Sequence, residues 1–328
     1  MAFIHNNEVQ YTELENAIRL ATRIGLRQTN ITLDLPEWDT IQKRDRLIGV
    51  SLSGVMDFQD ALGWVQKPHG DTTYTTHSIS TELAILLSRL KLIAESEALR
   101  YASEMRIPAP LLSLTIKPSG TISKLPTISA GIHRNRAPYY IRRVRITSSD
   151  PLAKVMLNAG FPVYPLVTSQ GYTEAQYYEM KPYELAIELQ KAHTWVIEFP
   201  VKTSATQRSM DESAVSQFGR YLDFQRYWTT HNTSVTIEFA PEEIPDLVEM
   251  LLQHWNEYVG VSFIMKNTTA YPQLPEQVIT EEEYLRRYAQ IQHITPSKIL
   301  EDLQTIEFEN AMTELLDADC IGGACPIR

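Results

Sequence analysis

The chain has 328 residues, 43% of them hydrophobic, and a formal net charge of -10, enough for one large or two ordinary globular domains. An acidic chain is unlike proteins that bind nucleic-acid backbones, because those proteins need clustered Lys and Arg on their surface. A local pocket in such a chain can still bind a small phosphorylated ligand. It has no charged-then-apolar leader and no apolar run long enough to cross a bilayer, so we expect a soluble cytoplasmic protein without nucleic-acid or membrane partners.

The first part of the chain alternates helical and strand patterns. The predicted elements are, in order, a helix at 11–28 that stops near Gly25, a strand at 31–35, a strand at 47–56, a helix at 57–63, a helix at 80–106 and a strand at 111–116. Ser80 has the chemistry of an N-cap, and Pro108 would end the long helix that Ser80 begins.

The second part continues the alternation. It predicts a strand at 139–146, a helix at 150–160, a strand at 195–200, a helix at 213–228, a strand at 234–239, a helix at 241–258, a strand at 261–265 and helices at 281–289 and 296–309. Strands that alternate with long helices indicate an α/β fold with largely parallel pairing. We expect one domain, residues 1–313, followed by a mobile tail, residues 314–328.

A turn rich in Gly, Ser and Thr follows the predicted strand at 111–116, with the sequence KPSGTIS at 117–123. The glycine lets the backbone approach an anion, and a helix N-terminus behind the turn would direct free N–H groups at that anion. These features predict a cradle for nucleotide phosphates. Ordinary turn chemistry accounts for the same residues without a ligand, so both interpretations remain open at this point.

The chain has only two cysteines, Cys320 and Cys325, near its carboxyl terminus. The glycines between them would let a disulfide close easily, and a terminal segment gives thiols access to an exchange partner. Zinc binding is the competing use, but it needs two further ligands, and His293, the nearest histidine, lacks the usual spacing. Spacing alone leaves the use of the pair open.

Five arginines follow the turn, namely Arg134, Arg136, Arg142, Arg143 and Arg145. They would attract a nucleotide, but basic residues that alternate along a strand favour a solvated or interface face. His133 and His231 are single histidines beside loops, and we assign neither of them a ligand role.

Several blocks of the sequence resemble class II ribonucleotide reductases, in the family's order from about Thr32 onward. The blocks are LDLPEW at 33–38, RLIGVSLSGVMD at 46–57, SLTIKPSGTIS at 113–123, GIHR at 131–134, APYYIRRVR at 137–145, DPL at 150–152, YWTTHNTSVTI at 227–237 and GVSF at 260–263.

The resemblance implies a role for both motifs. It implies that the substrate phosphates are bound, mainly by backbone N–H groups, at Pro118, Ser119, Gly120, Thr121, Ile122 and Ser123. It implies that Cys320 and Cys325 re-reduce the active site after each turnover, with thioredoxin or a similar dithiol protein as reductant. The implied fold is the second half of a ten-stranded α/β barrel with a flexible carboxy-terminal tail. The implied cofactor of the assembled enzyme is adenosylcobalamin, and the substrates are ribonucleoside diphosphates or triphosphates.

The family's radical chemistry needs three more cysteines, one of which forms a thiyl radical, and no cysteine precedes Cys320. We therefore expect an upstream partner chain, from a split gene, to supply the radical cysteine and to cover the open edges of half a barrel; a truncated protein is the alternative. Two further hypotheses are a fragment of a class I large subunit and a non-catalytic nucleotide-binding or regulatory remnant.

Overall fold

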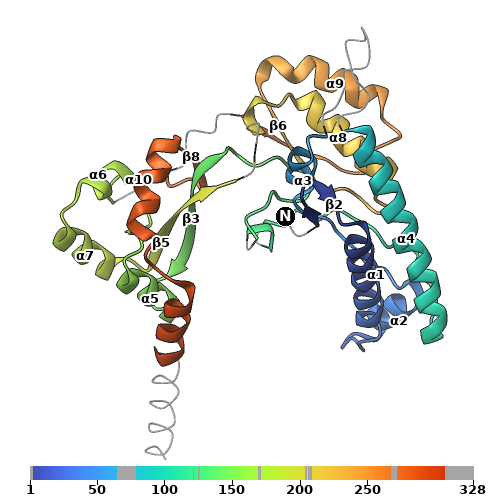
Figure 1. Cartoon of the computed structure of the whole chain (residues 1–328), viewed down its shortest axis with the longest axis horizontal. Coiled ribbons are helices and arrows are strands. Elements are labelled where there is room, and N and C mark those ends of the chain that lie inside the picture. The colour runs from blue at the N-terminus through green and yellow to red at the C-terminus, as the bar shows by residue number, and fades with distance from the viewer. Residues whose placement is uncertain are drawn as a thin grey trace, which may run out of the picture. The chain divides into compact units, whose positions relative to one another are not determined.

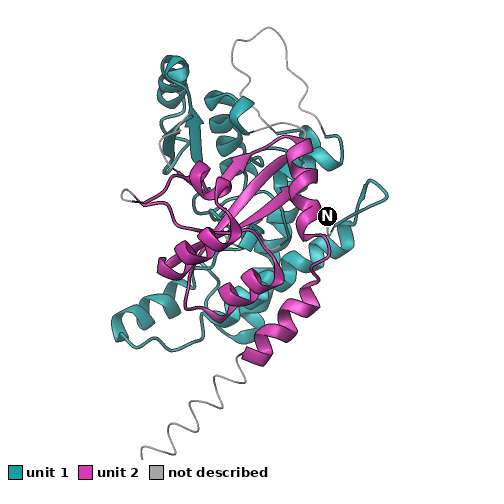
Figure 2. Ribbon diagram, turned by 90° about the vertical axis from the view of Figure 1, so that its left-hand side faces the viewer, with its two compact units in different colours: residues 1–138, 203–268 teal, residues 139–202, 269–328 magenta. Residues whose placement is uncertain are grey.

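The computed structural model of the chain describes residues 3–64, 79–120, 122–124, 126–168, 171–203, 205, 209–266 and 272–306. The chain forms two compact units, residues 1–138 with 203–268 and residues 139–202 with 269–328, coloured separately in Figure 2. Each unit is therefore built from two separate stretches of sequence. The sequence pattern did not indicate this division, and the single domain at 1–313 stays a prediction, as does the tail at 314–328, which lies outside the described residues.

The first unit is mainly helical (Figure 1). Its elements are β1 (Ile4–His5), β2 (Glu8–Val9), α1 (Tyr11–Gln28), α2 (Pro36–Asp45), α3 (Val55–Ala61), α4 (Thr81–Met105), η1 (Ile122–Lys124), η2 (Ser209–Asp211), α8 (Ala214–Tyr227), β6 (Thr236–Phe239), η3 (Pro241–Glu243), α9 (Ile244–Gln253) and β7 (Ser262–Met265). Strands β6 and β7 pair in parallel, and parallel bridges join Val50 to Leu114 and Ile116 to Thr233. Parallel pairing is thus confirmed for these segments, whereas β1 and β2 pair antiparallel.

The core of the first unit lies between α1, α4 and α8. Helix α4 begins where predicted, because the Ser80 hydroxyl accepts a hydrogen bond from Leu83 N (3.1 Å). Its leucine stripe is buried, and so are the large aromatic side chains Phe218, Tyr221 and Trp228 on and after α8. The same core contains Val50 and Ile116, so the packing of the helices fixes the two strand segments that lead to the candidate turn.

The second unit is an antiparallel sheet with helices packed against it. Its elements are β3 (Tyr139–Thr147), α5 (Pro151–Ala159), β4 (Val163–Pro165), α6 (Glu174–Glu179), α7 (Pro182–Lys191), β5 (Thr194–Lys202), β8 (Glu276–Val278) and α10 (Glu281–Ile291), and residues 296–306 are also helical. The strand order is β4-β5-β3-β8, with every neighbouring pair antiparallel.

The antiparallel sheet corrects the expectation of largely parallel pairing. Thr147 at the end of β3 pairs with Thr194 at the start of β5, so the connection between the two strands starts and finishes at the same end of the sheet. A connection that contains helices gives parallel pairing only when it carries the chain back to the opposite end of the sheet before the next strand begins. The helices between β3 and β5 do not cross over.

Three of the expected boundaries are also wrong. Helix α1 continues through Gly25 to Gln28. Gly25 does not end the helix but lets it pack closely on Ile48, because a Cβ at position 25 would meet that side chain at 3.4 Å. The expected strand at 31–35 is replaced by bends that lead into α2, which has Pro36 in its first turn. The helix expected at 241–258 ends at Gln253.

Candidate functional site

The candidate turn follows a segment that was predicted to be a strand. In the structure the segments expected as strands at 47–56 and 111–116 form only isolated parallel bridges, which join Val50 to Leu114 and Ile116 to Thr233. The parallel bridge between Val50 and Leu114 means that the residues after them, 51–54 and 117–120, run on in the same direction. These two stretches therefore lie close enough to contact each other.

Two serines from the neighbouring segment hold the turn. Lys117 N donates to Ser51 Oγ (3.0 Å), and Ser53 Oγ and Ser119 Oγ share a hydrogen bond of 2.7 Å. Ser119 has a φ of +50°, a left-handed conformation that is uncommon for a residue other than glycine. The two contacts offset the cost of that conformation. The sequence analysis did not assign Ser51 or Ser53 to the site, although both lie in the VSLSG block at 50–54.

The backbone of the turn has unused donors. Within the part of the chain that the structure describes, the amides of Ser119, Gly120 and Ile122 donate no hydrogen bond. Gly120 is exposed, and a Cβ built there would meet nothing within 4 Å. No internal contact requires a glycine at this position, so its lack of a side chain leaves the backbone open to an external group. Thr121 lies outside the described residues.

Ser123 is used inside the turn. Its side chain is buried, its hydroxyl donates to Ser119 O (2.5 Å), and its amide lies 3.4 Å from the same oxygen. The helix expected behind the turn is only the three-residue η1, because Pro126 follows closely and prevents an α-helix from continuing. The expected contribution of a helix dipole is therefore wrong, and individual amides are the donors that remain.

A buried carboxylate anchors the loop that follows the turn. Asp57 Oδ2 accepts from Ser129 N, and Asp57 Oδ1 accepts from Asn135 Nδ2, both at 2.6 Å. Between these contacts Gly131 has a φ of +54°, and a Cβ there would lie 3.0 Å from Lys117 O. The loop thus packs closely against the start of the turn, and any side chain at position 131 would displace it.

Three of the five arginines that follow the turn are paired with carboxylates. Arg134 Nη1 lies 2.7 Å from Asp60, and Arg136 Nη1 lies 2.6 Å from Glu238. Arg143 is buried in the second unit, which contradicts the expected solvated or interface face at this position. These three cations are neutralised within the protein, so the attraction of a nucleotide does not depend on them.

The two histidines near the turn are structural. His133 Nε2 accepts from Thr236 N (3.1 Å) and its Nδ1 donates to Ala130 O (3.0 Å), while burial lowers the pKa of His133. His231 Nε2 bonds to Ile48 O (2.8 Å). The described residues contain no group of three side chains able to hold a metal ion, and none of the helices they form could cross a bilayer. Cys320 and Cys325 lie outside the described residues.

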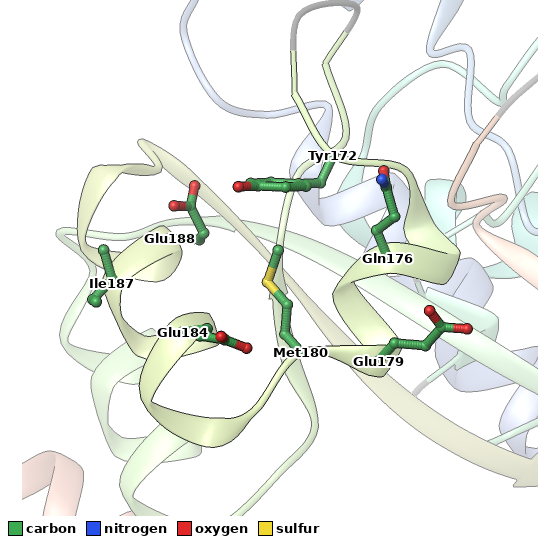
Figure 3. A pocket seen from close by; sticks show the side chains of 7 residues that line it. All are labelled: Tyr172, Gln176, Glu179, Met180, Glu184, Ile187 and Glu188. Carbon is green, nitrogen blue, oxygen red and sulfur yellow. The ribbon is translucent and has the colours of Figure 1, made fainter.

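A cavity of about 390 Å³ lies between α6 and α7 in the second unit (Figure 3). Met180 lines it together with polar side chains that already have partners. Gln176 and Glu184 accept from backbone amides at the starts of the two helices (2.8 and 2.9 Å), and Glu188 pairs with Lys191 (2.7 Å). The polar lining of this cavity supports helix ends, so it is a weaker candidate than the turn.

Known proteins of similar sequence carry one recurring name. No family model matches the sequence. The adenosylcobalamin-dependent ribonucleoside-triphosphate reductase of Levilactobacillus brevis is 27% identical over 339 residues, which cover 98% of this chain and 42% of the relative. The protein of the same name from Lactobacillus delbrueckii subsp. bulgaricus is 28% identical over 350 residues, with the same coverage.

A solved structure agrees with these relatives. A crystal structure of a B12-dependent (class II) ribonucleotide reductase matches with a TM-score of 0.73 at 24% sequence identity, over 89% of this chain and 39% of that protein. The expected resemblance and the α/β fold are thereby confirmed. The chain spans about two fifths of the length of the curated relatives that it matches.

Proposed function

This chain is a relative of the class II ribonucleotide reductases over nearly its whole length, and we propose that it forms part of an enzyme that reduces ribonucleotides to deoxyribonucleotides. It supplies the turn at 118–123, which binds the phosphates of the substrate. Ribonucleoside triphosphates are the preferred substrate class, since the relatives are named as triphosphate reductases. Diphosphates remain the alternative that a substrate comparison tests.

The observation that carries this proposal is that the amides of Ser119, Gly120 and Ile122 have no acceptor among the described residues. Phosphate oxygens are strong acceptors, and bonds from N–H groups to an anion are stronger than those between neutral groups. The exposed Gly120 lets the anion come within hydrogen-bonding distance of the main chain. No cation has to be recruited for this contact, which agrees with the pairing of the nearby arginines.

The relatives' names imply adenosylcobalamin, which would generate the radical in the assembled enzyme. The corrin ring of cobalamin already holds its cobalt, so the cofactor needs no cluster of metal-binding side chains, and no contact with it is assigned among the described residues. We therefore assign the cofactor to the assembled enzyme and no step of its chemistry to these residues.

The radical cysteine must come from polypeptide outside these residues, because the sequence has no cysteine before Cys320. Cys320 and Cys325 then act as shuttle thiols that return reducing equivalents from thioredoxin or a similar dithiol protein. If the chain is instead a fragment of a class I large subunit, the assembled enzyme should be active without adenosylcobalamin. If it is a non-catalytic remnant, no complementary polypeptide should give turnover.

The turn is tested with Gly120→Asp in the enzyme assembled with its complementary polypeptide. The new carboxylate would lie where the phosphates bind, so we expect the KM for a ribonucleoside triphosphate to rise about tenfold or more while the melting temperature stays unchanged. Gly260→Asp is the matched control, because Gly260 is also exposed in the first unit and its nearest neighbour to a Cβ is 3.8 Å away. Equal KM values for the two variants would refute the assignment of the turn.

The shuttle is tested with Cys325→Ser in the same assembled enzyme. We expect multiple turnover with thioredoxin to stop, while a small dithiol that reaches the active site directly still supports it. Unchanged turnover with thioredoxin would show that the pair has another use.

A further inference from the structure

Helix α9 carries a stripe of apolar side chains that the fold leaves exposed. Ile244, Val248, Leu252, Trp255 and Val259 recur at intervals of three or four residues along the helix and the turn after it, and their exposed fractions are 43, 47, 66, 66 and 72%. This spacing places Ile244, Val248 and Leu252 on one face of α9. Trp255 and Val259 follow the end of the helix and continue the run of exposed apolar side chains. Figure 1 shows α9 on the outside of the first unit, next to α8.

The stripe is not needed for the core of its own unit. Leu247 and Met250, on another face of α9, are buried and supply the contacts with the core. The outward face of a surface helix is ordinarily charged or polar. A row of exposed aliphatic side chains that includes a Trp is instead typical of a binding surface, because Trp and its apolar neighbours act as anchors when a partner removes them from water.

The charges beside the stripe restrict its partner. Glu242, Asp246 and Glu249 follow one another at intervals of four and three residues and so line one flank of it. The sequence contains no Lys or Arg between Arg226 and Lys266. A second copy of this chain, or an anionic membrane, would place negative charge against this flank, which is unfavourable.

We propose that the α9 stripe is a docking site for a protein segment that combines apolar anchors with Lys or Arg residues, such as a basic amphipathic helix laid along α9. Its apolar side chains cover Val248, Leu252 and Trp255, and its cations face the acidic flank. Helices recognised in this way present anchors at the same three- and four-residue spacing. The proposal is independent of the reductase function.

The test uses the complete chain and two synthetic helical peptides, one built of Leu and Lys and the other of Leu and Glu with the same pattern. We expect the Leu/Lys peptide to bind and Leu252→Asp to weaken that binding about tenfold or more. The matched control is Leu92→Asp on α4, where the leucine is 65% exposed, against 66% for Leu252. Both variants gain one negative charge, so general attraction of a cationic peptide to an acidic protein affects them equally.

A second variant tests the flank separately. Glu249→Lys keeps every apolar side chain of the stripe, and we expect it to weaken binding of the Leu/Lys peptide and to permit binding of the Leu/Glu peptide. Equal binding of the Leu/Lys peptide to the Leu252→Asp and Leu92→Asp proteins would overturn the proposal. Two other results would also overturn it. One is a dimer in light scattering that Leu252→Asp abolishes, because the stripe would then bind a second copy of the chain. The other is binding to phosphatidylcholine vesicles that Leu252→Asp abolishes, because the stripe would then bind a membrane.

Discussion

Asp57 shows how one buried carboxylate positions the candidate turn from a distance. It accepts hydrogen bonds from Ser129 N and Asn135 Nδ2, and so fixes the loop that packs on Lys117. In Asp57→Asn the amide nitrogen would face one of these donors and leave it unsatisfied in the core. We expect the free energy of unfolding to fall by about 1–3 kcal/mol in urea denaturation. Asp34→Asn, at an exposed position, is the control, and an equally small effect of both substitutions would contradict this account.

Arg143 organises the second unit in a similar way. Its Nε lies 2.7 Å from Glu198 and its Nη2 lies 2.5 Å from Glu174, and Tyr178, whose pKa is raised by burial and by Glu198, bonds to the same groups. Arg143→Met would leave the buried Glu198 with Arg287 as its one remaining cation and would remove the partner of Glu174, so we expect a loss of about 3 kcal/mol in chemical denaturation. Arg145→Met removes an exposed arginine from the same strand and should change stability little. Similar losses in the two variants would show that the network does not stabilise the unit.

At the residue scale, the position of the turn could be predicted from its sequence, but the side chains that hold it could not. The KPSGTIS turn stands out in the sequence, whereas the contact between Ser53 and Ser119 joins residues 66 positions apart and depends on two segments bridging in parallel. The alternation of basic residues along the strand predicted an exposed Arg143. That prediction is wrong, because Glu198 and Tyr178 bond to the guanidinium group inside the unit. Local sequence carries no record of such distant partners.

The pairing of α1 with α4 includes an ion pair that makes stability depend on pH. The hydrogen bond from Arg100 and then that from Arg23 hold the pKa of Glu97 at about 2, below the usual 4.5. A depressed carboxyl pKa contributes stability that is fully present above pH 4.5 and is lost as the pH falls toward 2. We expect Glu97→Gln to cost about 1 kcal/mol at pH 7, since the two guanidinium groups are partly exposed and solvent screens them.

The measurement for this pair is urea denaturation at pH 7 and near pH 2. The difference between Glu97→Gln and the unmodified protein should shrink strongly at the lower pH, because most of the stability linked to the ionisation of Glu97 is lost between pH 4.5 and its folded-state pKa of about 2. Glu104→Gln is the control, because Glu104 pairs with Arg100 at the exposed end of the same network. A difference that persists near pH 2 would assign the loss to packing rather than charge.

At the element scale, long helices with clear caps were predictable and short elements were not. Ser80, and Asp150 followed by Pro151, cap α4 and α5 as their positions suggested, and Gly160 ends α5 with a φ of +96°. The three-residue strands β4 and β8 exist only because β5 and β3 offer a neighbouring edge, and a strand that depends on its neighbour leaves little pattern of its own. The direction of β5 relative to β3 could not be predicted either, because it depends on which strands pair and not on the sequence of β5 itself.

At the scale of the whole molecule, the chain corresponds to only part of the length of its relatives. It spans about two fifths of the length of its relatives, and in the described part of the chain β7 pairs with β6 alone while Phe263, Ile264 and Met265 are exposed. An apolar strand with an open edge ordinarily acquires a partner. This agrees with our proposal that further polypeptide completes the enzyme, which the division into two compact units did not by itself indicate.

The most direct test of the central claim is hydrogen–deuterium exchange of the assembled enzyme, followed by mass spectrometry of the peptides that cover residues 117–124. A saturating ribonucleoside triphosphate should slow exchange at the amides of Ser119, Gly120 and Ile122, and the corresponding nucleoside without phosphates should not, because only phosphate oxygens reach those donors. Unchanged exchange in these peptides, while the triphosphate is bound and turned over, would contradict the account.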